Sequence, residues 1–313
     1  MANILITHGV PAEGFYALYE HTLIIPPPLK AFTTEELQEH IVKADAVVAG
    51  GRLDGDTIRL GKQLKVIANY GAGYDSVDIA AAAACGVPVT NLPTAVQATT
   101  AELAIALMMS VSRRVGEMNL RLRREQPETL FGMGREMGFN LYGKTLGIVG
   151  VGRIGSRVAQ VAKALGMRVI GTNRHGISSD VCEQVTMDEL LETADVVSLH
   201  CPLNDETRGM IDAAAIAKMK RGAMLINTAR GAIVNSEALA EAVASGHLAG
   251  AGLDVYPDEP HIPVCLLKQQ RIVLTPHVGA NTADTRYAMA EACSKQILDA
   301  LAGKRPENIV NGL

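Results

Sequence analysis

The chain has 313 residues, 48% of them hydrophobic and 20% charged, which gives enough apolar material for two globular domains and excludes a disordered protein. Its formal net charge is −4 and it has no long basic run, so we expect no nucleic-acid partner. The five cysteines are scattered and none lies in a cluster with zinc-like spacing, so we expect reduced thiols and no metal. No apolar run is long enough to span a membrane, so we expect no membrane contact. Because the N-terminus also lacks a signal-peptide pattern, we expect a cytoplasmic location.

The first third of the chain alternates short apolar runs with helical patterns. A capping box at Thr33-Thr-Glu-Glu36 predicts the start of one helix, and Asp75–Cys85, which Gly86 ends, predicts another. The apolar runs predict the strands of a first parallel sheet, namely Ile4–Thr7, Ala46–Ala49, Val66–Asn69 and Val87–Thr90.

A strongly apolar helix is predicted over Thr99–Arg114, followed by a glycine-containing loop or arm over Gln126–Leu141. A second alternating set then predicts six strands, Leu146–Val149, Arg168–Gly171, Val196–Leu199, Met224–Asn227, Gly252–Asp254 and Ile272–Leu274. The helices predicted between them are Ile154–Leu165, Met187–Thr193, Ala213–Met219 and Ser236–Ser245. A last amphipathic helix, Arg286–Ala302, is placed to return to the first domain.

This alternation predicts an α/β fold of two Rossmann-like domains, each with a doubly wound parallel sheet, and a cleft between them. We expect residues 1–98 plus 286–313 to form a substrate domain and residues 99–285 to form a dinucleotide-binding domain.

A glycine-rich turn supports the second assignment. Gly150-Val-Gly-Arg-Ile-Gly155 follows a predicted strand and opens a predicted helix, which is the context that gives this motif its meaning. Gly150 permits the tight turn, Gly152 lets backbone approach a pyrophosphate, and Gly155 lets the helix press on the sheet. The helix N-terminus then offers N–H groups to the phosphates.

The next strand of this domain ends in Thr172-Asn-Arg174, without an acid before Asp180. A site for NAD carries Asp or Glu about 20 residues beyond the glycine turn, where it holds the ribose 2′-hydroxyl. Asn173 and Arg174 would instead bind a 2′-phosphate, which a carboxylate would repel. We therefore predict a preference for NADP(H), with NAD(H) also possible; the alternative is that Arg174 stacks on adenine or lies on the surface.

Three charged residues each follow a predicted strand in the last third of the chain. The planar fork of Arg230 suits the carboxylate of a 2-keto acid, and His277 can donate a proton to the developing alkoxide. Glu259 would hydrogen-bond the other ring nitrogen, orient the ring and stabilise its protonated form. Each has a structural alternative: a helix-capping arginine, a surface acid and a turn histidine.

The first domain is expected to supply the other wall of the site. Ala72 and Gly73 follow a predicted strand, and their N–H groups form a candidate nest for a carboxylate. Arg52 stands at another strand end and is a candidate substrate contact. A plain turn is the alternative for Ala72 and Gly73, and an arginine without a substrate contact is the alternative for Arg52. His200, at a strand end before Cys201 and Pro202, is placed to line the cofactor site.

At these residues the chain resembles the D-isomer-specific 2-hydroxyacid dehydrogenase family, through the motifs GIVGVGRIG, LHCPL with the following ETRGMI, INTARGAIV, AGLDVYPDEP and LTPHVGA. The resemblance implies that Arg230 binds the keto acid, Glu259 partners the acid–base and His277 is the acid–base. It also implies substrate contacts at Ala72 and Gly73. The expected cofactor contacts are Thr100, Gly150, Gly152, Arg153, Ile154, Gly155, Asn173, Arg174, His200, Cys201, Pro202, Thr207, Thr228, Ala229, Asp254 and Gly279.

Within that family, the length and the Thr172-Asn-Arg174 segment are similar to NADPH-dependent glyoxylate/hydroxypyruvate reductases and hydroxyphenylpyruvate reductases. The resemblance thus implies an NAD(P)-dependent oxidoreductase that reduces a small 2-keto acid to the D-2-hydroxy acid, and a homodimer formed through the cofactor domain. Two alternatives stay open: a reductase of bulkier keto acids such as phenylpyruvate, and a dinucleotide-sensing binding protein like the transcriptional corepressors that resemble this family.

Overall fold

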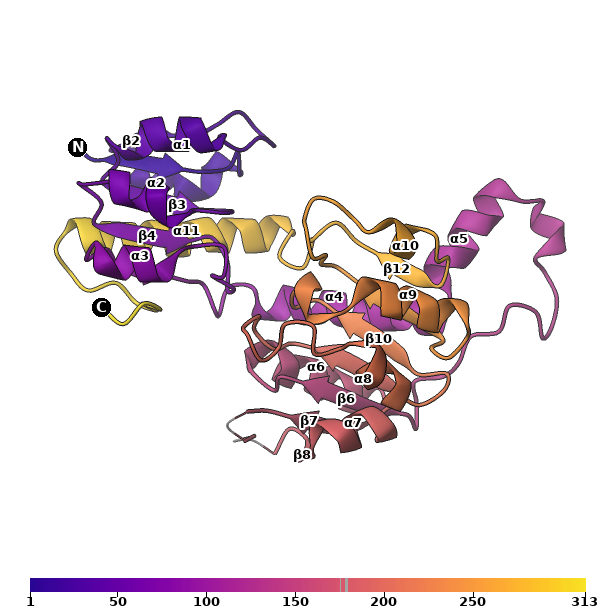
Figure 1. The fold of residues 1–313 in the computed structure, drawn as a ribbon. Helices are drawn as coiled ribbons and strands as arrows, with labels where there is room; N and C mark the ends of the chain where they lie inside the picture. Colours follow the sequence, from indigo (N-terminus) through magenta and orange to yellow (C-terminus); the bar gives the residue numbers. More distant parts are fainter. Residues whose placement is uncertain (175, 178–179) are drawn as a thin grey trace. The chain divides into compact units, whose positions relative to one another are not determined.

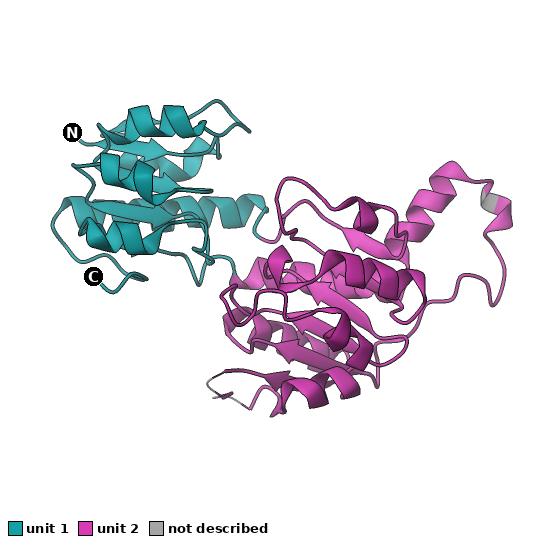
Figure 2. Cartoon of the chain, in the orientation of Figure 1, with its two compact units in different colours: residues 1–96, 280–313 teal, residues 97–279 magenta. Residues whose placement is uncertain are grey.

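The computed structural model describes residues 1–174, 176–177 and 180–313, and the chain divides into two compact units (Figure 2). Unit 1 comprises Met1–Val96 and Ala280–Leu313, and unit 2 comprises Gln97–Gly279. His175, one of the histidines to which the sequence gives no role, lies outside the described residues. Among the helices that are described, none is both long enough and apolar enough to cross a membrane.

Unit 1 is built on a five-stranded parallel sheet in the order β2-β1-β3-β4-β5. This is the flavodoxin-like order, in which the strand sequence reverses between β1 and β3. The strands are β1 (Asn3–Ile6), β2 (Thr22–Ile24), β3 (Ala46–Ala49), β4 (Val66–Asn69) and β5 (Val89–Thr90).

Helices cover both faces of this sheet, because the strands are apolar on both sides (Figure 1). One face packs against α1 (Thr34–Ile41), α2 (Gly55–Leu60) and α3 (Ile79–Ala84). The other packs against the short helix η1 (Ala12–Leu18) and the last helix, α11 (Ala283–Leu301). Met289, Cys293 and Ile297 of α11 are fully buried in that layer, so the C-terminal helix belongs to unit 1.

Unit 2 has a seven-stranded parallel sheet in the order β12-β11-β10-β9-β6-β7-β8, which contains the Rossmann arrangement. The order reverses between β6 and β9, the point at which such sheets bind ligands. The strands are β6 (Thr145–Val149), β7 (Arg168–Thr172), β8 (Glu183–Gln184), β9 (Val196–Leu199), β10 (Met224–Asn227), β11 (Gly250–Leu253) and β12 (Ile272–Leu274).

The helices of unit 2 form two layers around its sheet. One layer contains α4 (Gln97–Ser112) and α6 (Arg153–Ala164), and the other contains α7 (Met187–Thr193), α8 (Ala213–Lys218) and α9 (Ser236–Ala244). The shorter elements are α5 (Val115–Arg124), η2 (Pro127–Thr129), η3 (Gly231–Ile233) and α10 (Val264–Leu267). The first turn of α4 lies beside the end of the unit, since the Thr100 hydroxyl donates to the Gly279 carbonyl at 3.4 Å.

The predicted fold class, α/β with two Rossmann-like units and parallel sheets, is confirmed. The capping box at Thr33 is present, with the Thr33 hydroxyl accepting from the Glu36 N–H and the Glu36 carboxylate accepting from the Thr33 N–H. The start of the helix predicted over Asp75–Cys85 was wrong. The corresponding helix, α3, begins at Ile79, and the Asp78 side chain accepts from the Ala81 N–H as its N-cap.

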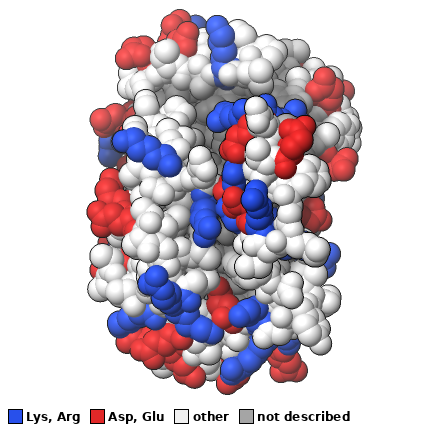
Figure 3. Space-filling view, turned by 90° about the vertical axis from the view of Figure 1, so that its right-hand side faces the viewer, with Lys and Arg blue, Asp and Glu red and all other residues white. Residues whose placement is uncertain are grey.

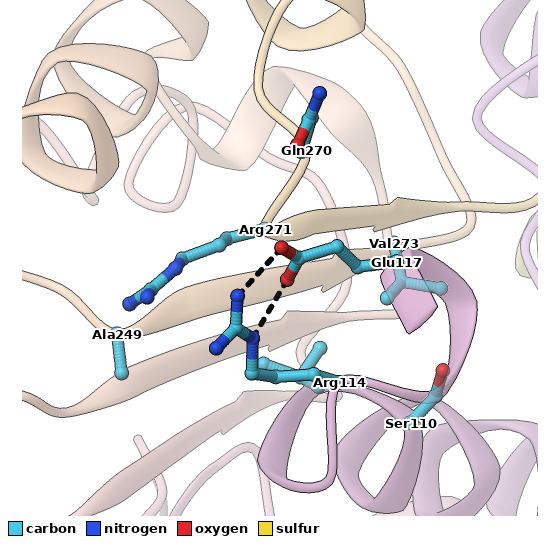
Figure 4. A pocket seen from close by; sticks show the side chains of 8 residues that line it. Ser110, Arg114, Glu117, Ala249, Gln270, Arg271 and Val273 are labelled. Carbon is cyan, nitrogen blue, oxygen red and sulfur yellow. Dashed lines mark hydrogen bonds and ion pairs between the residues drawn. The ribbon is translucent and has the colours of Figure 1, made fainter. Parts of the chain in front are cut away.

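A helix that the sequence did not predict, α5, lies between α4 and the arm expected over Gln126–Leu141, and it projects from the body of unit 2 (Figure 1). Arg114 stands at its start with a left-handed backbone (φ 55°) and pairs with both Glu117 and Glu136 at 2.6 Å. Arg121 also pairs with Glu136, so these ions tie the returning loop to the helix. Figure 4 shows the Arg114–Glu117 pair in a pocket next to β12.

Candidate functional site

The glycine turn of unit 2 has the shape that a dinucleotide cradle requires. Gly150 has φ +94°, and a Cβ there would lie 2.6 Å from the Cys201 nitrogen. A Cβ on Gly155 would lie 2.3 Å from the Gly150 carbonyl oxygen. At Gly152, by contrast, a Cβ would meet no atom of the described residues within 4 Å, and no side chain among those residues caps the N-terminus of α6. The first N–H groups of α6 therefore face open space, where a phosphate can accept from them.

Two buried polar atoms at the same edge of the sheet fit a polar ligand. His200 Nδ1, after β9, and Thr228 Oγ1, after β10, have no hydrogen-bond partner among the residues that the structure describes. Buried polar atoms rarely stay unpaired, so these two positions suit the polar groups of a bound dinucleotide. Burial lowers the pKa of His200 to about 4, so this ring is neutral at pH 7.

The cysteine that follows His200, Cys201, is half-buried. Burial raises the pKa of the Cys201 thiol to about 11, which keeps it protonated. The following turn is closed by the Thr207 hydroxyl, which donates to the Pro202 carbonyl at 2.7 Å, and by Asn204, whose side-chain oxygen accepts from the Thr207 N–H at 3.0 Å. Asn204 was not predicted from the sequence; its signal is the Asn-x-x-Thr spacing of a side-chain-bonded turn.

The residues expected to determine the preference for NADP(H) over NAD(H) lie at the end of β7. The Gly150 N–H donates to the Thr172 carbonyl at 3.0 Å, so this strand end is next to the glycine turn. The Asn173 side chain donates to the Gly176 carbonyl at 3.2 Å, and exposed Arg174 pairs with Glu206 at 3.0 Å. Positions 172–174 thus present an amide and a guanidinium, and no carboxylate.

The structure brings Glu259 and His277 together. His277 Nδ1 and Glu259 Oε2 are 2.6 Å apart, and Glu259 Oε1 accepts from the Tyr256 N–H at 3.0 Å. Burial alone would raise the pKa of Glu259, but the hydrogen bonds from His277 and Tyr256 and the charge of Arg230 outweigh burial and lower it. Glu259 is therefore a carboxylate that fixes one side of the His277 ring.

Arg230 lies close enough to this pair for its charge to contribute to the lowered pKa of Glu259. Its backbone is held by buried Asn227 at the end of β10, which accepts from the Ala229 N–H at 3.0 Å and donates to the Arg230 carbonyl at 2.9 Å. The Arg230 Nη1 donates to the Ala229 carbonyl at 2.8 Å. Asn227 was not predicted as a site residue, although a polar residue that ends a buried strand is a usable signal.

Asp254 holds the backbone turn that carries His277. Its side chain is 1% exposed, and it accepts from the Thr275 hydroxyl (2.6 Å), the Val278 N–H (2.8 Å) and the Gly279 N–H (2.8 Å). The His277 N–H donates to the Asp254 carbonyl at 2.9 Å, and His277 has a left-handed backbone (φ 51°). From the sequence, Asp254 was expected to be a cofactor contact. In the structure its side chain and its carbonyl bind the backbone of the turn that carries the His277 ring.

The other side of the ring is open to solvent. The His277 side chain is 51% exposed, and none of the described residues hydrogen-bonds its Nε2. Since Nδ1 is held by Glu259, Nε2 is the atom left to exchange a proton with a ligand. Glu259 and His277 thus form an oriented acid–base pair beside a guanidinium.

Ala72, Gly73 and Arg52 lie in unit 1, at carboxyl ends of its strands. Asn69, at the end of β4, donates to the Gly73 carbonyl at 2.9 Å, and Asn91 donates to the Ala72 carbonyl at 2.7 Å. These bonds fix the turn by its carbonyl groups. The N–H groups of Ala72 and Gly73 make no hydrogen bond within the described part of the chain, as a nest for an anion requires.

The charge distribution on one face and the arrangement of His, Cys, Asp and Glu side chains bear on other kinds of site. Figure 3 shows positive and negative side chains interspersed on the face that it presents, without a continuous basic field. Within the described ranges, no group of three His, Cys, Asp or Glu side chains is arranged to hold a metal.

Residues 105–279 match the family model described as "D-isomer specific 2-hydroxyacid dehydrogenase, NAD binding domain". A glyoxylate reductase of Thermococcus litoralis is 38% identical over 321 residues, covering 99% of this chain and 96% of the relative. Among solved structures, a glyoxylate reductase from Paecilomyes thermophila has a TM-score of 0.89 and 32% identity, with 99% of this chain and 98% of that chain covered. An NADPH-dependent glyoxylate/hydroxypyruvate reductase from Sinorhizobium meliloti, in complex with NADP and malonate, has a TM-score of 0.86 and 26% identity, with 99% and 96% covered.

Proposed function

The chain belongs to the D-isomer-specific 2-hydroxyacid dehydrogenase family, and on that premise we propose that it reduces glyoxylate or hydroxypyruvate to the D-2-hydroxy acid with NADPH. The observation that carries the chemistry is the 2.6 Å hydrogen bond between Glu259 and His277 next to the charge of Arg230. Members of this family are oxidoreductases that act on small 2-keto and 2-hydroxy acids.

In this proposal each side chain has one task. The Arg230 fork binds the keto-acid carboxylate by charge-assisted hydrogen bonds. His277, protonated and oriented by Glu259, donates the proton on Nε2 to the carbonyl oxygen as it gains negative charge. Asp254 keeps His277 in position through the turn that both share. A bound reduced nicotinamide supplies the hydride.

We assign the dinucleotide to the edge of unit 2 that carries the glycine turn. The α6 N-terminus, His200 Nδ1 and Thr228 Oγ1 are the groups that would hold it. NADP(H) is favoured over NAD(H) because Asn173 and Arg174 stand where an NAD site carries an acid. The Sinorhizobium meliloti relative, described as NADPH-dependent, agrees with this choice.

Unit 1 is proposed to complete substrate binding with the N–H groups of Ala72 and Gly73 and with Arg52. The small substrates named for the relatives favour glyoxylate and hydroxypyruvate over bulkier keto acids. We also propose a homodimer, since the arm exposes Phe131, Met133 and Met137 to solvent, and a cytoplasmic location, since all five cysteines are free.

The test is a panel of 2-keto acids of increasing size, glyoxylate, hydroxypyruvate, pyruvate and phenylpyruvate, each with NADPH and with NADH. The oxidation of the nicotinamide is followed by its absorbance, and kcat/KM is compared. The highest kcat/KM is expected for glyoxylate or hydroxypyruvate with NADPH. A preference for phenylpyruvate would replace the substrate assignment, a preference for NADH would overturn the cofactor assignment, and no turnover with any acid would favour a dinucleotide sensor.

A further inference from the structure

Arg174 and Glu206 come from loops on opposite sides of the glycine turn. β7 and β9 are the two neighbours of β6 in the sheet; Arg174 follows β7, and Glu206 follows β9. Arg174 Nη2 and Glu206 Oε1 are 3.0 Å apart. One ion pair therefore joins the two loops that flank the strand leading into the dinucleotide turn.

Glu206 stands on a turn that is fixed by its own hydrogen bonds. The Asn204 side-chain oxygen accepts from the Glu206 and Thr207 N–H groups, both at 3.0 Å. The Thr207 hydroxyl also donates to the Pro202 carbonyl. The backbone at Glu206 is thus set by the sequence of the turn, which keeps its carboxylate within reach of Arg174.

We propose that Glu206 determines cofactor specificity by competing with the 2′-phosphate of NADP(H) for the Arg174 guanidinium, which weakens the preference for NADP(H). The inference rests on the proposed role of Arg174. A phosphate monoester carries about −1.5 to −2 charges at neutral pH, and it accepts from the same N–H donors as a carboxylate. NAD(H) has a neutral hydroxyl at this position, so Glu206 acts on one cofactor and not on the other.

The size of the effect follows from the exposure of the pair. The Arg174 and Glu206 side chains are 64% and 59% exposed, so water and salt screen their interaction. Releasing Arg174 from an exposed partner of this kind changes a binding constant by up to about fivefold, and removing the repulsion between carboxylate and phosphate adds a similar factor at low salt. We expect a total gain of roughly 3- to 25-fold for NADPH, the upper end being the product of the two factors.

The experiment measures the Kd of NADPH and of NADH, by nicotinamide fluorescence, for the full-length wild type and Glu206→Gln at low salt and at about 0.5 M salt. Glu206→Gln is expected to bind NADPH more tightly by the stated factor, with NADH unchanged and with a smaller gain at high salt. Glu206→Ser removes the same charge with a different side chain. If both variants bind NADPH more tightly, the gain comes from the lost charge and not from misfolding of one variant.

The matched control is Glu183→Gln. Glu183 pairs with Arg168 at 2.7 Å with similar exposure, 57% and 55%, but Arg168 is at the opposite end of β7 from Arg174. This variant removes the same charge and the same kind of ion pair without touching the glycine turn. It should leave both Kd values unchanged, and an equal tightening of NADPH in this control would overturn the local role of Glu206.

Arg174→Gln separates failure of this inference from failure of the proposed function. If Arg174→Gln weakens NADPH binding but neither Glu206 variant tightens it, competition is overturned and the NADP(H) assignment stands. If Arg174→Gln leaves NADPH binding unchanged, the assignment of Arg174 to the 2′-phosphate is itself wrong. In the Arg174→Gln background, removal of Glu206 is expected to give a smaller gain, because no guanidinium remains to be released.

Discussion

Replacing Glu259 by glutamine removes one negative charge from the side chain that holds the His277 ring, with almost no change in shape. The 2.6 Å contact to Nδ1 can persist, because an amide oxygen also accepts from a ring N–H. The variant loses charge assistance, which makes such a bond about twice as strong as a neutral one, and it loses one acceptor, because the single amide oxygen of glutamine cannot replace both carboxylate oxygens that accept from His277 and from the Tyr256 N–H. With the two side chains 34% and 51% exposed, the loss is about 1 kcal/mol in the stability of the protonated ring.

The direction of the pH effect follows from the proton that each reaction needs. Keto-acid reduction requires the protonated ring, and the variant holds that proton less firmly. The alkaline limb of kcat/KM for reduction is therefore expected to move to lower pH. For oxidation of the hydroxy acid, which requires the deprotonated ring, the acidic limb moves to lower pH as well.

The assay is the pH profile of kcat/KM in both directions for the wild type, Glu259→Gln and Asp258→Asn. Asp258 is the adjacent acid and its side chain is 92% exposed, so its variant removes the same charge without contact to the His277 ring. Its limbs are expected to match those of the wild type. If the limbs of Glu259→Gln also match the wild type, or if both variants shift equally, Glu259 does not control the His277 proton.

Three further substitutions test the same site. His277→Ala should lower kcat by roughly 10²–10⁴-fold with the Kd of NADPH preserved, and an unchanged kcat would remove His277 from the reaction. Arg230→Lys keeps the charge but loses the planar fork, so the KM of the keto acid should rise about tenfold or more; a wild-type KM would exclude the clamp. Gly231→Ala places a Cβ 1.9 Å from the backbone carbon of Tyr256, so it should cost about 1–3 kcal/mol and lower the Tm by several degrees. Gly116→Ala, whose Cβ would meet its nearest neighbour at 3.7 Å, is the control and should not lower the Tm; equal Tm values for the two variants would show that the Gly231 site relaxes freely.

The central strands could be predicted because burial on both faces requires uninterrupted apolar runs. Val66–Asn69, Val196–Leu199 and Met224–Asn227 were predicted with their exact bounds. The edge strands β2 and β8 were missed, because an edge strand needs no apolar run: Glu183–Gln184 is exposed, and Thr22–Ile24 is exposed or half-buried. Helix α5 was missed for a related reason, since Glu117 is the one residue of that helix described as buried.

The candidate site was predictable where chemistry and strand ends coincide. Glu259 and His277 were expected as partners, and the structure joins them. The support around them was not predictable, because it depends on contacts between residues distant in sequence. Asp254 reaches Val278 and Gly279, some 25 positions further on, and nothing local distinguishes a carboxylate that accepts from backbone N–H groups from one that faces a ligand. The Arg174–Glu206 pair likewise required the strand order.

Unit 2 is a single uninterrupted insertion, and its two ends are adjacent, as the contact between Thr100 and Gly279 shows. Because the two ends of residues 97–279 lie next to each other, this segment can be removed, or exchanged for that of a relative, without a change in the backbone path of the segments on either side. Exchanging residues 97–279 would therefore replace the glycine turn together with Arg230, Glu259 and His277, while residues 1–96 and 280–313 stay as they are.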